Sequence, residues 1–224
     1  MNVCVLIPTK NEEKSIGPLV TEIISLGHKY VVVVDDSTDN TKEVASAAGA
    51  TVIDGCKKGL GSAIRLGMCI ARAHEFRYVV VFDAGMTHNP KMISQLLAVA
   101  KNGYGLVIAS RFIKTDYKHQ GFRTGVSLWA ANLVRCLWGI DVHDATAGFR
   151  CYDLEVFDRR VMRESFASGH AVQLELLALG RLAGCSIAEA ESDYAPLTNS
   201  TFSFKSVLEA VWVLYRMFVL IVMS

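Results

Sequence analysis

The sequence lacks an excess of charge of either sign. Its 224 residues include 23 Lys and Arg against 22 Asp and Glu, which leaves a formal charge of +1. Such a chain has no global field to attract an anionic polymer, so we expect no nucleic-acid partner. Internal repeats and low-complexity segments are also missing, and hydrophobic residues make up 51% of the chain. This composition excludes a disordered or collagen-like protein.

The sequence also lacks a zinc-binding pattern and a typical secretion signal. None of the six cysteines belongs to a Cys-x-x-Cys pair or a Cys/His cluster, and we therefore expect no structural zinc. At the N-terminus, Pro8 interrupts the short apolar run Val3–Ile7 before it reaches the length of a signal segment. We expect a reducing, cytoplasmic location. The mean hydropathy of +0.30 nevertheless points weakly to an apolar partner.

Short β-branched segments alternate with helical patterns along the first half of the chain. Near-continuous apolar strands such as Tyr30–Asp35 are typical of a parallel sheet that is buried on both faces. The β-α-β alternation therefore predicts an α/β fold, doubly wound, with helices on both faces. Strands are predicted at 3–8, 30–35, 51–54, 78–83 and 106–110, helices at 13–26, 37–48, 60–74, 91–101, 123–137, 154–162 and 171–182, and a loop or strand at 144–152.

The C-terminal stretch Phe202–Met223 is strongly apolar but contains Lys205, Glu209 and Arg216. Its segment Val207–Met223 is at the short limit for a membrane span, and each of its two charges would cost about 2.5–3.5 kcal/mol at mid-bilayer. We therefore expect a domain at 1–200 followed by an apolar helix at 201–224 that does not simply span a membrane. Two interpretations stay open: a core helix, or a helix in the membrane interface with one face formed by Trp212, Tyr215, Phe218 and Met223.

Polar residues lie at the carboxyl ends of four of the predicted strands. They are Thr9 to Glu12, Asp35 with Asp36, Asp83, and Ser110 with Arg111. In doubly wound sheets, ligands bind just beyond the carboxyl ends of the strands. A single strand-terminal Asp is often only a helix cap, and Asp39 is a candidate for either role. Several such residues on consecutive strands instead predict a ligand site at this edge.

Several motifs, in order along nearly the whole chain, resemble those of family 2 inverting glycosyltransferases, and more narrowly the dolichol-phosphate mannosyltransferase branch. The set is specific, although each motif alone is weak. The motifs are Ile7–Glu12, Asp35–Thr41, Gly59–Ala63, Phe82–Lys91, Ser110–Phe112, Asp144–Arg150 and Gln173-x-Glu175. The resemblance implies a GT-A fold, which is Rossmann-like with a mixed, mostly parallel sheet. It also implies transfer of a hexose such as mannose, with inversion, from a nucleotide-sugar to polyprenyl or dolichyl phosphate.

The resemblance also implies partners and a location. The donor would be a GDP- or UDP-linked sugar, and the enzyme would be a short form that lies peripherally on the cytoplasmic face of a membrane. A small membrane-anchoring subunit is a candidate partner by analogy. The implied donor-binding residues are Pro8, Glu12, Asp35, Asp36, Ala84 and Lys205. Carboxylates suit the base N–H and ribose hydroxyl groups, whereas an Arg of relatives is replaced by Asn199 here.

The metal-binding Asp-x-Asp motif of the family reads Asp83-Ala84-Gly85 in this sequence and lacks its second carboxylate. Mg²⁺ accepts one or two carboxylates together with phosphates, so Asp83 and Thr87 are the expected ligands of Mg²⁺ or Mn²⁺. Glu175 is a candidate replacement ligand, with a partly buried ion pair as the alternative. Residues implied to be catalytic are Asp83, Arg111, Gln173 and Glu175. If the exchange weakens the metal site, the protein would be a nucleotide-sugar-binding protein with weak or lost catalysis.

The acceptor phosphate is assigned by the resemblance to Arg111, Arg123 and Ser127. Arg123 and Ser127 are four residues apart on a predicted helix and therefore share a face; a solvated face is the plain alternative. A phosphate monoester has a second pKa of about 6 and is already a nucleophile at neutral pH, so no strong base is required and His88 is expected to be a positioning or surface residue. A non-lipid hydroxyl acceptor is a third interpretation. It would need a general base such as Glu175.

Overall fold

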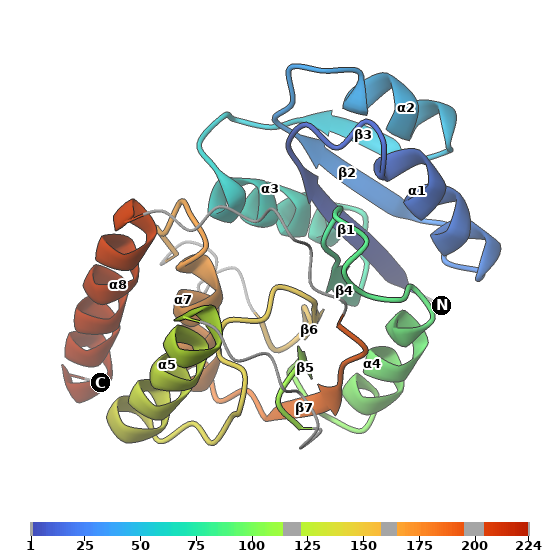
Figure 1. Cartoon of the computed structure of the whole chain (residues 1–224). Coiled ribbons are helices and arrows are strands. Elements are labelled where there is room, and N and C mark those ends of the chain that lie inside the picture. Colours follow the sequence, from blue (N-terminus) through green and yellow to red (C-terminus); the bar gives the residue numbers. More distant parts are fainter. Residues whose placement is uncertain (1, 114–121, 158–164, 195–203, 224) are drawn as a thin grey trace.

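The computed structural model describes residues 2–113, 122–157, 165–194 and 204–223. Its strands form a seven-stranded sheet in the order β3-β2-β1-β4-β6-β5-β7, in which β6 is antiparallel to both neighbours and the other pairs are parallel (Figure 1). The predicted mixed, mostly parallel α/β sheet is therefore confirmed. The strands are β1 Val3–Thr9, β2 Val31–Asp35, β3 Thr51–Asp54, β4 Tyr78–Val81, β5 Leu106–Ser110, β6 Arg150–Asp153 and β7 Ile187–Glu191.

Helices cover both faces of this sheet (Figure 1). Side chains alternate between the faces along each strand, so that Leu6 of β1 belongs to the core cluster that includes residues of α3, α5, α7 and α8, whereas Ile7 belongs to the cluster that includes residues of α1 and α4. Both clusters consist largely of Val, Ile, Leu and Ala, which explains the continuous apolar runs in the sequence. The helices are α1 Ile16–Ser25, α2 Thr41–Ala47, α3 Leu60–Ala73, α4 Met92–Ala100, α5 Phe122–Trp138, α7 Val172–Leu182 and α8 Phe204–Met223.

The strand directions bring the predicted polar residues to one edge. Thr9, the last residue of β1, pairs with Asp35, the last residue of β2, and β4 runs parallel to β1. Since β6 is antiparallel to both β4 and β5, these two strands also point the same way. The residues after β1, β2, β4 and β5 therefore share the carboxyl edge of the sheet, as the sequence predicted.

The structure differs from the predicted elements at β7 and after β6. Strand β7 was not among the predicted strands. Its Ala and Glu residues alternate with the period of two that is typical of a half-buried strand. Of the helix predicted at 154–162, residues 154–157 form a turn and 158–164 lie outside the described residues. The strand at 106–110 was predicted with the observed bounds.

Helix α8 packs on one side as the core-helix interpretation expects, and its membrane-interface interpretation stays a prediction. Val213, Leu214 and Met217 are buried on the side that packs against α7 and α5, as expected of a core helix. The opposite side exposes Trp212, Tyr215 and Phe218. Among the described residues, the helices are all too short or too polar to cross a bilayer. The division of the chain at residue 200 stays a prediction.

Candidate active site

The turns after β1 and β2 interlock at the carboxyl edge. The hydroxyls of Thr9 and Ser37 donate hydrogen bonds to Asp35 Oδ1 over 2.8 and 2.5 Å. Asp36 Oδ1 accepts a hydrogen bond from the backbone N–H of Lys57 over 2.8 Å, in the loop after β3. These donors are neutral, so they fix both carboxylates in place without cancelling their charge. The Asp35 and Asp36 carboxylates therefore present oriented negative charge at the carboxyl edge of the sheet. Such charge suits the N–H and O–H groups of a ligand.

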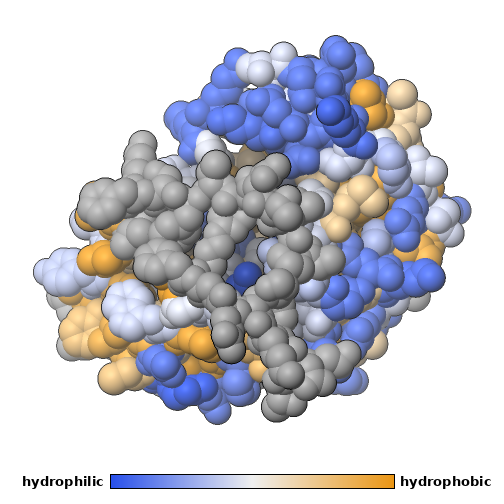
Figure 2. Space-filling view, in the orientation of Figure 1, coloured by the Kyte–Doolittle hydropathy of each residue, from blue (hydrophilic) through white to orange (hydrophobic). Residues whose placement is uncertain are grey.

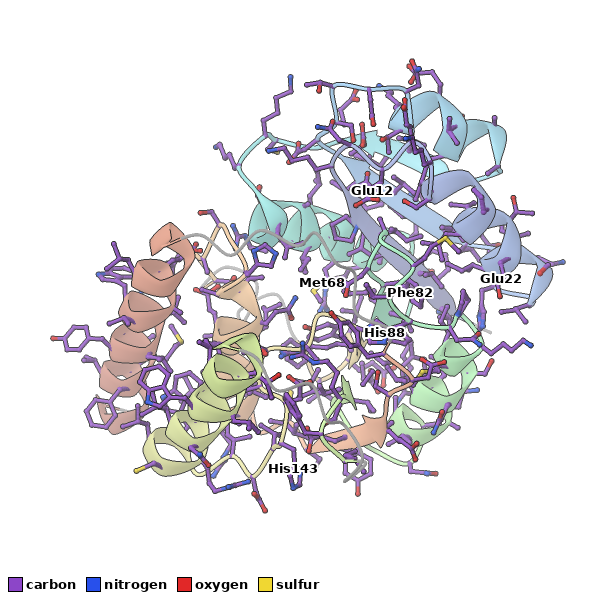
Figure 3. The ribbon with its side chains drawn as sticks, in the orientation of Figure 1. Glu12, Glu22, Met68, Phe82, His88 and His143 are labelled. Atoms are coloured by element: carbon purple, nitrogen blue, oxygen red, sulfur yellow. The ribbon has the colours of Figure 1, made fainter. Side chains whose placement is uncertain are left out.

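The β1 turn itself depends on a left-handed residue. Asn11 has a φ of 59°, a conformation that Asn tolerates better than most residues. Its N–H donates to Ser37 Oγ and its side-chain oxygen accepts the N–H of Thr38. Glu12 follows at the upper end of the sheet in Figure 3, and its carboxylate accepts a 2.6 Å hydrogen bond from Ser15 Oγ.

Asp39, one residue before the N-cap Asn40, forms a local turn at the start of α2. Its Oδ1 accepts the backbone N–H of Thr41, the first helical residue, and the hydroxyl of the same residue. The side-chain hydrogen bond from Thr41 lowers the pKa of Asp39. Asp39 therefore does not occupy the N-cap position that the sequence offered it, and its alternative role in ligand contact stays a prediction.

Asp83 lies just after β4 with an accessible carboxylate, whose side chain is 46% exposed. Gly148 approaches it so closely that a Cβ there would lie 2.9 Å from Asp83 Oδ1. The Thr87 hydroxyl oxygen is buried without a hydrogen-bond partner among the described residues. Ala84 is buried beside Asp83. Both residues of the predicted metal pair thus lie in one loop, Asp83 with an accessible carboxylate and Thr87 with a buried hydroxyl.

His88 is buried next to the same loop. Its ring packs against Phe82, its neighbour in Figure 3, and against Phe149. Nδ1 lies 3.0 Å from Ser192 Oγ, and Nε2 lies 4.0 Å from Asp83 Oδ2. Burial lowers the pKa of His88, which favours the neutral imidazole. His88 is therefore a buried residue beside Asp83 and not a surface histidine.

Arg111 and Ser127 meet at the end of β5. Arg111 Nη2 lies 3.5 Å from Ser127 Oγ, and Thr146 joins them through hydrogen bonds of 2.9 Å to each side chain. Arg111 also forms a two-point ion pair with the buried carboxylate of Asp144. The structure therefore brings together two of the three residues predicted to hold the acceptor phosphate. Arg123 lies in the first turn of α5, and its side chain is outside the described part.

Glu175 and Gln173 occupy the first turn of α7. The Glu175 carboxylate is fully buried and accepts hydrogen bonds from Ser165 Oγ and from the N–H groups of Phe166 and Ala167. No cation pairs with it among the described residues. Gln173 Oε1 is buried without a partner there, while its backbone carbonyl accepts a hydrogen bond from Arg150 Nη1.

Some site features were not assigned from the sequence. Asp144 and Thr146 belonged to a recognised motif but had no role, since only the fold brings them to Arg111. The predicted donor residue Pro8 is part of β1, whereas the side chain of Lys205 and the whole of Asn199 lie outside the described residues. Within the described ranges, no group of three or more His, Cys, Asp or Glu side chains is placed to hold a metal.

A hollow at the opposite edge of the sheet carries none of these residues. It is lined at the amino ends of β1 and β2 by Asn2, Lys29 and Tyr30, and at the end of α3 by His74. In doubly wound sheets, ligand sites lie at the carboxyl edge. The clustered polar residues therefore identify the functional edge, and this hollow does not.

The family model described as "Glycosyl transferase family 2" matches residues 4–161. The chain belongs to this family. It is a glycosyltransferase of the dolichol-phosphate mannosyltransferase-like type, as the motifs implied. It is 29% identical to a dolichyl-phosphate hexose transferase of Haloferax volcanii, over 89% of this chain and 86% of that protein. It is also 30% identical to a polyprenol monophosphomannose synthase of Mycolicibacterium smegmatis, over 77% and 69% of the two chains.

A third relative and a solved structure complete the comparison. Over 51% of this chain and 34% of the other, the sequence is 38% identical to a dolichol-phosphate mannosyltransferase of Pyrococcus furiosus. The fold matches that of a glucosyl-3-phosphoglycerate synthase from Mycobacterium tuberculosis, solved with Mn²⁺, UDP and phosphoglyceric acid, at a TM-score of 0.73 and 21% identity. That match covers 96% of this chain and 78% of the other and confirms the GT-A-like fold.

Proposed function

We propose that this glycosyltransferase moves a hexose from a nucleoside-diphosphate sugar to polyprenyl phosphate, with inversion at the anomeric carbon. The observation that carries the proposal is the shared carboxyl edge, where the β1 and β2 carboxylates and the Arg111–Ser127 pair occupy different strand ends. One end suits the hydroxyl and N–H groups of a nucleoside, and the other suits a phosphate. The names of the Haloferax, Mycolicibacterium and Pyrococcus relatives support a lipid-phosphate acceptor.

The donor would lie along the β1–β3 side. Asp35, Asp36 and Glu12, with Pro8 in β1, would bind the nucleoside through their oriented oxygens. Ala84 would line the path toward the diphosphate, which Lys205 would contact. The sugar to be transferred is a hexose, with mannose as the leading candidate, and its nucleotide is GDP or UDP.

The residues present fit a divalent cation, Mg²⁺ or Mn²⁺. Asp83 offers an accessible carboxylate, and the Thr87 hydroxyl lacks a partner among the described residues. One carboxylate with substrate phosphates is a common way of holding Mg²⁺. When bound, such an ion neutralises charge on the leaving diphosphate. Gly85 supplies no second carboxylate, so we expect donor phosphates to contribute much of the affinity.

The acceptor phosphate would be held by Arg111, Arg123 and Ser127 beside the anomeric carbon. With a second pKa of about 6, the phosphate monoester is charged at neutral pH. One of its oxygens forms the new glycosidic bond while the bond to the diphosphate breaks and that group leaves with the electron pair. Orientation and charge neutralisation would together supply most of the acceleration in such a displacement. Gln173 would face the sugar.

A hydroxyl acceptor is the second candidate, because the solved structure of similar fold binds phosphoglyceric acid. An alcohol is not ionised at neutral pH and needs a general base. The sequence offered Glu175 for this role and as a replacement metal ligand. Its buried carboxylate instead accepts hydrogen bonds from the 165–167 segment. These contacts favour a structural role for Glu175 and therefore the phosphate acceptor.

A peripheral position on the cytoplasmic face of a membrane completes the proposal. Hydrophobic residues gather over α5 and α8 in Figure 2. Trp129 of α5 and Trp212 of α8 are each 54% exposed, whereas Trp138 is buried. Aromatic side chains of this kind are favoured at the bilayer interface. On titration with phosphatidylcholine–phosphatidylglycerol vesicles, the emission of a protein that retains Trp129 and Trp212 should shift to the blue. A W129F/W212F variant that retains Trp138 should show no shift.

Transfer itself is tested by incubating the protein with radiolabelled GDP- or UDP-hexose, polyprenyl phosphate and Mg²⁺ or Mn²⁺. Label that enters the organic phase, with the anomeric configuration inverted, is the expected result. Saturable nucleotide-sugar binding without any labelled lipid would instead support a binding protein with lost catalysis. Comparison of GDP and UDP titrations identifies the base.

A further inference from the structure

The Arg111 side chain is held by a carboxylate that had no assigned part in the site. Asp144 lies 33 residues further along the chain, and its Oδ2 accepts the Arg111 Nε–H over 2.6 Å. Its Oδ1 accepts Nη2–H over 2.7 Å, so that the carboxylate faces the guanidinium at two points. The Asp144 side chain is 0% exposed. Such two-point geometry fixes the plane of the guanidinium as well as its position.

Asp144 is itself held by β7. Glu189 accepts hydrogen bonds from the backbone N–H groups of His143 and Asp144, each over 2.8 Å. A further 2.7 Å contact joins Glu189 Oε2 to the His143 ring, which lies at the lower edge of Figure 3. Because Glu189 is part of a strand paired with β5, the loop that carries Asp144 is tied to the strand that precedes Arg111.

Thr146 extends this arrangement to Ser127. Its hydroxyl accepts a hydrogen bond from Arg111 Nη2 and donates one to Ser127 Oγ, both over 2.9 Å. Its backbone N–H donates to Asp144 Oδ1 over 3.3 Å. Asp144 and Thr146, two residues apart in one loop, therefore set the relative positions of Arg111 and Ser127, which are 16 residues apart in the sequence.

We propose that Asp144 and Thr146 are positioning residues for the acceptor phosphate. This inference rests on the proposed function, in which Arg111 and Ser127 contact that phosphate. Asp144 cancels the net charge of Arg111 locally, so the contribution of Arg111 is the direction of its N–H groups rather than extra positive charge. Removal of the Asp144 carboxylate frees the Arg111 guanidinium to rotate. It leaves the Asp35 and Asp36 carboxylates at the other end of the edge unchanged.

The test compares Asp144→Asn with Asp141→Asn. Asp141 lies in the same loop, but its side chain is 81% exposed and pairs with Arg135 at the surface, which makes it a matched control. We expect Asp144→Asn to raise the KM for polyprenyl phosphate about tenfold or more, the scale of a misplaced contact in a site of this kind. The KM for the nucleotide-sugar should stay unchanged, and Asp141→Asn should match the wild type in both constants.

Two further variants distinguish a positioning role of the Thr146 hydroxyl from a general effect on folding. Thr146→Val removes the hydroxyl that links Arg111 to Ser127, and Thr146→Ser keeps it. We expect only Thr146→Val to raise the KM for polyprenyl phosphate. A merely structural role would instead lower kcat for the Asp144 and Thr146 variants and leave both KM values unchanged. A role in charge suppression would lower the KM for polyprenyl phosphate in Asp144→Asn. Either result overturns the proposal.

A binding measurement distinguishes this inference from the proposed function itself. Farnesyl phosphate is a short isoprenyl phosphate whose binding to the whole chain can be followed by titration calorimetry. Binding by the wild type and about tenfold weaker binding by Asp144→Asn is the expected pattern. Equal binding by both proteins refutes the positioning role of Asp144 but leaves the proposed acceptor standing. No binding by the wild type, together with no labelled lipid, refutes the proposed acceptor and this inference with it.

Discussion

The two halves of the carboxyl edge hold their charged groups in different ways. On the β1–β2 side, Asp35 and Asp36 accept hydrogen bonds from neutral hydroxyl and N–H groups. On the β5 side, Arg111 is held by the opposite charge of buried Asp144. Neutral donors leave the carboxylates free to attract ligand donors, whereas the ion pair converts a cation into a set of directed N–H groups. The first half is built for charge and the second for orientation.

The largest effect should come from the residue between the two halves. Asp83→Ala removes the one carboxylate of the Asp-x-Asp position, and we expect transfer to fall by about 100-fold or more, since charge stabilisation at the leaving group is lost. Gly85→Asp should raise metal-dependent turnover by restoring the second carboxylate. Initial rates at increasing Mn²⁺ concentration measure both variants. An unchanged rate for Asp83→Ala would show that the metal is not held there.

A smaller and one-sided effect is expected at Arg111. Arg111→Lys keeps the positive charge but cannot form the two-point pair with Asp144. We expect the KM for polyprenyl phosphate to rise by about tenfold while the KM for the donor does not change. Steady-state kinetics with each substrate varied in turn provides the measurement. If both KM values rise together, Arg111 affects donor binding as well as acceptor binding. The proposed separation between the β1–β2 side and the β5 side would then be wrong.

The donor half can be disturbed through its backbone. A Cβ at Gly55 would lie 2.2 Å from Asp36 Oδ1, so Gly55→Ala must displace that carboxylate. We expect the KM for the nucleotide-sugar to rise severalfold and the free energy of unfolding to fall by roughly 1–3 kcal/mol, as overpacking does. Urea unfolding and donor titration test this expectation. Asp54→Asn, at an exposed residue paired with Lys42, is the control and should change neither.

The smallest effect is the pH dependence of the ion pair. Burial alone would raise the pKa of Asp144, but the hydrogen bonds and charge of Arg111 outweigh it and hold the pKa below its usual value. The contribution of the Asp144–Arg111 pair to the free energy of unfolding is therefore complete above the unfolded pKa of Asp, about 3.9. It is lost as the pH falls through the lower pKa of the folded state.

Urea unfolding of the wild type and of Asp144→Asn should differ by about 1.5–3 kcal/mol at pH 7. The difference should shrink as the pH falls below about 4, because the Asp144 carboxylate of the unfolded chain becomes protonated there while the folded chain keeps its charge to lower pH. A constant difference between pH 7 and pH 3 would contradict the assignment of this stabilisation to the charged Asp144 carboxylate.

Much of the fold was readable because its signals are local. The run Tyr30–Asp35 predicted a buried strand, since both faces of a parallel strand require apolar side chains. The α3 and α7 helices were found from their periodic apolar residues close to their observed bounds. β7 was missed because its Ala and Glu residues form only a weak alternating pattern.

The roles within the site were harder to predict. Glu175 was a reasonable candidate for a base or metal ligand by its place in a motif, yet its partners come from the 165–167 segment. Both sides of α8 are apolar, and packing against α7 and α5 decides which of them is buried. A motif identifies which residues matter, but the neighbours of each residue depend on the whole chain.

The amino-acid sequence alone determined the alternation of strands and helices, the family and the edge at which the polar residues gather, because each of these follows from side-chain spacing along the chain. Only the tertiary structure decided that Arg111 pairs with Asp144 and reaches Ser127 through Thr146. The physical reason is that a buried charge needs a partner across space, and the order of strands in the sheet determines which residue that partner is.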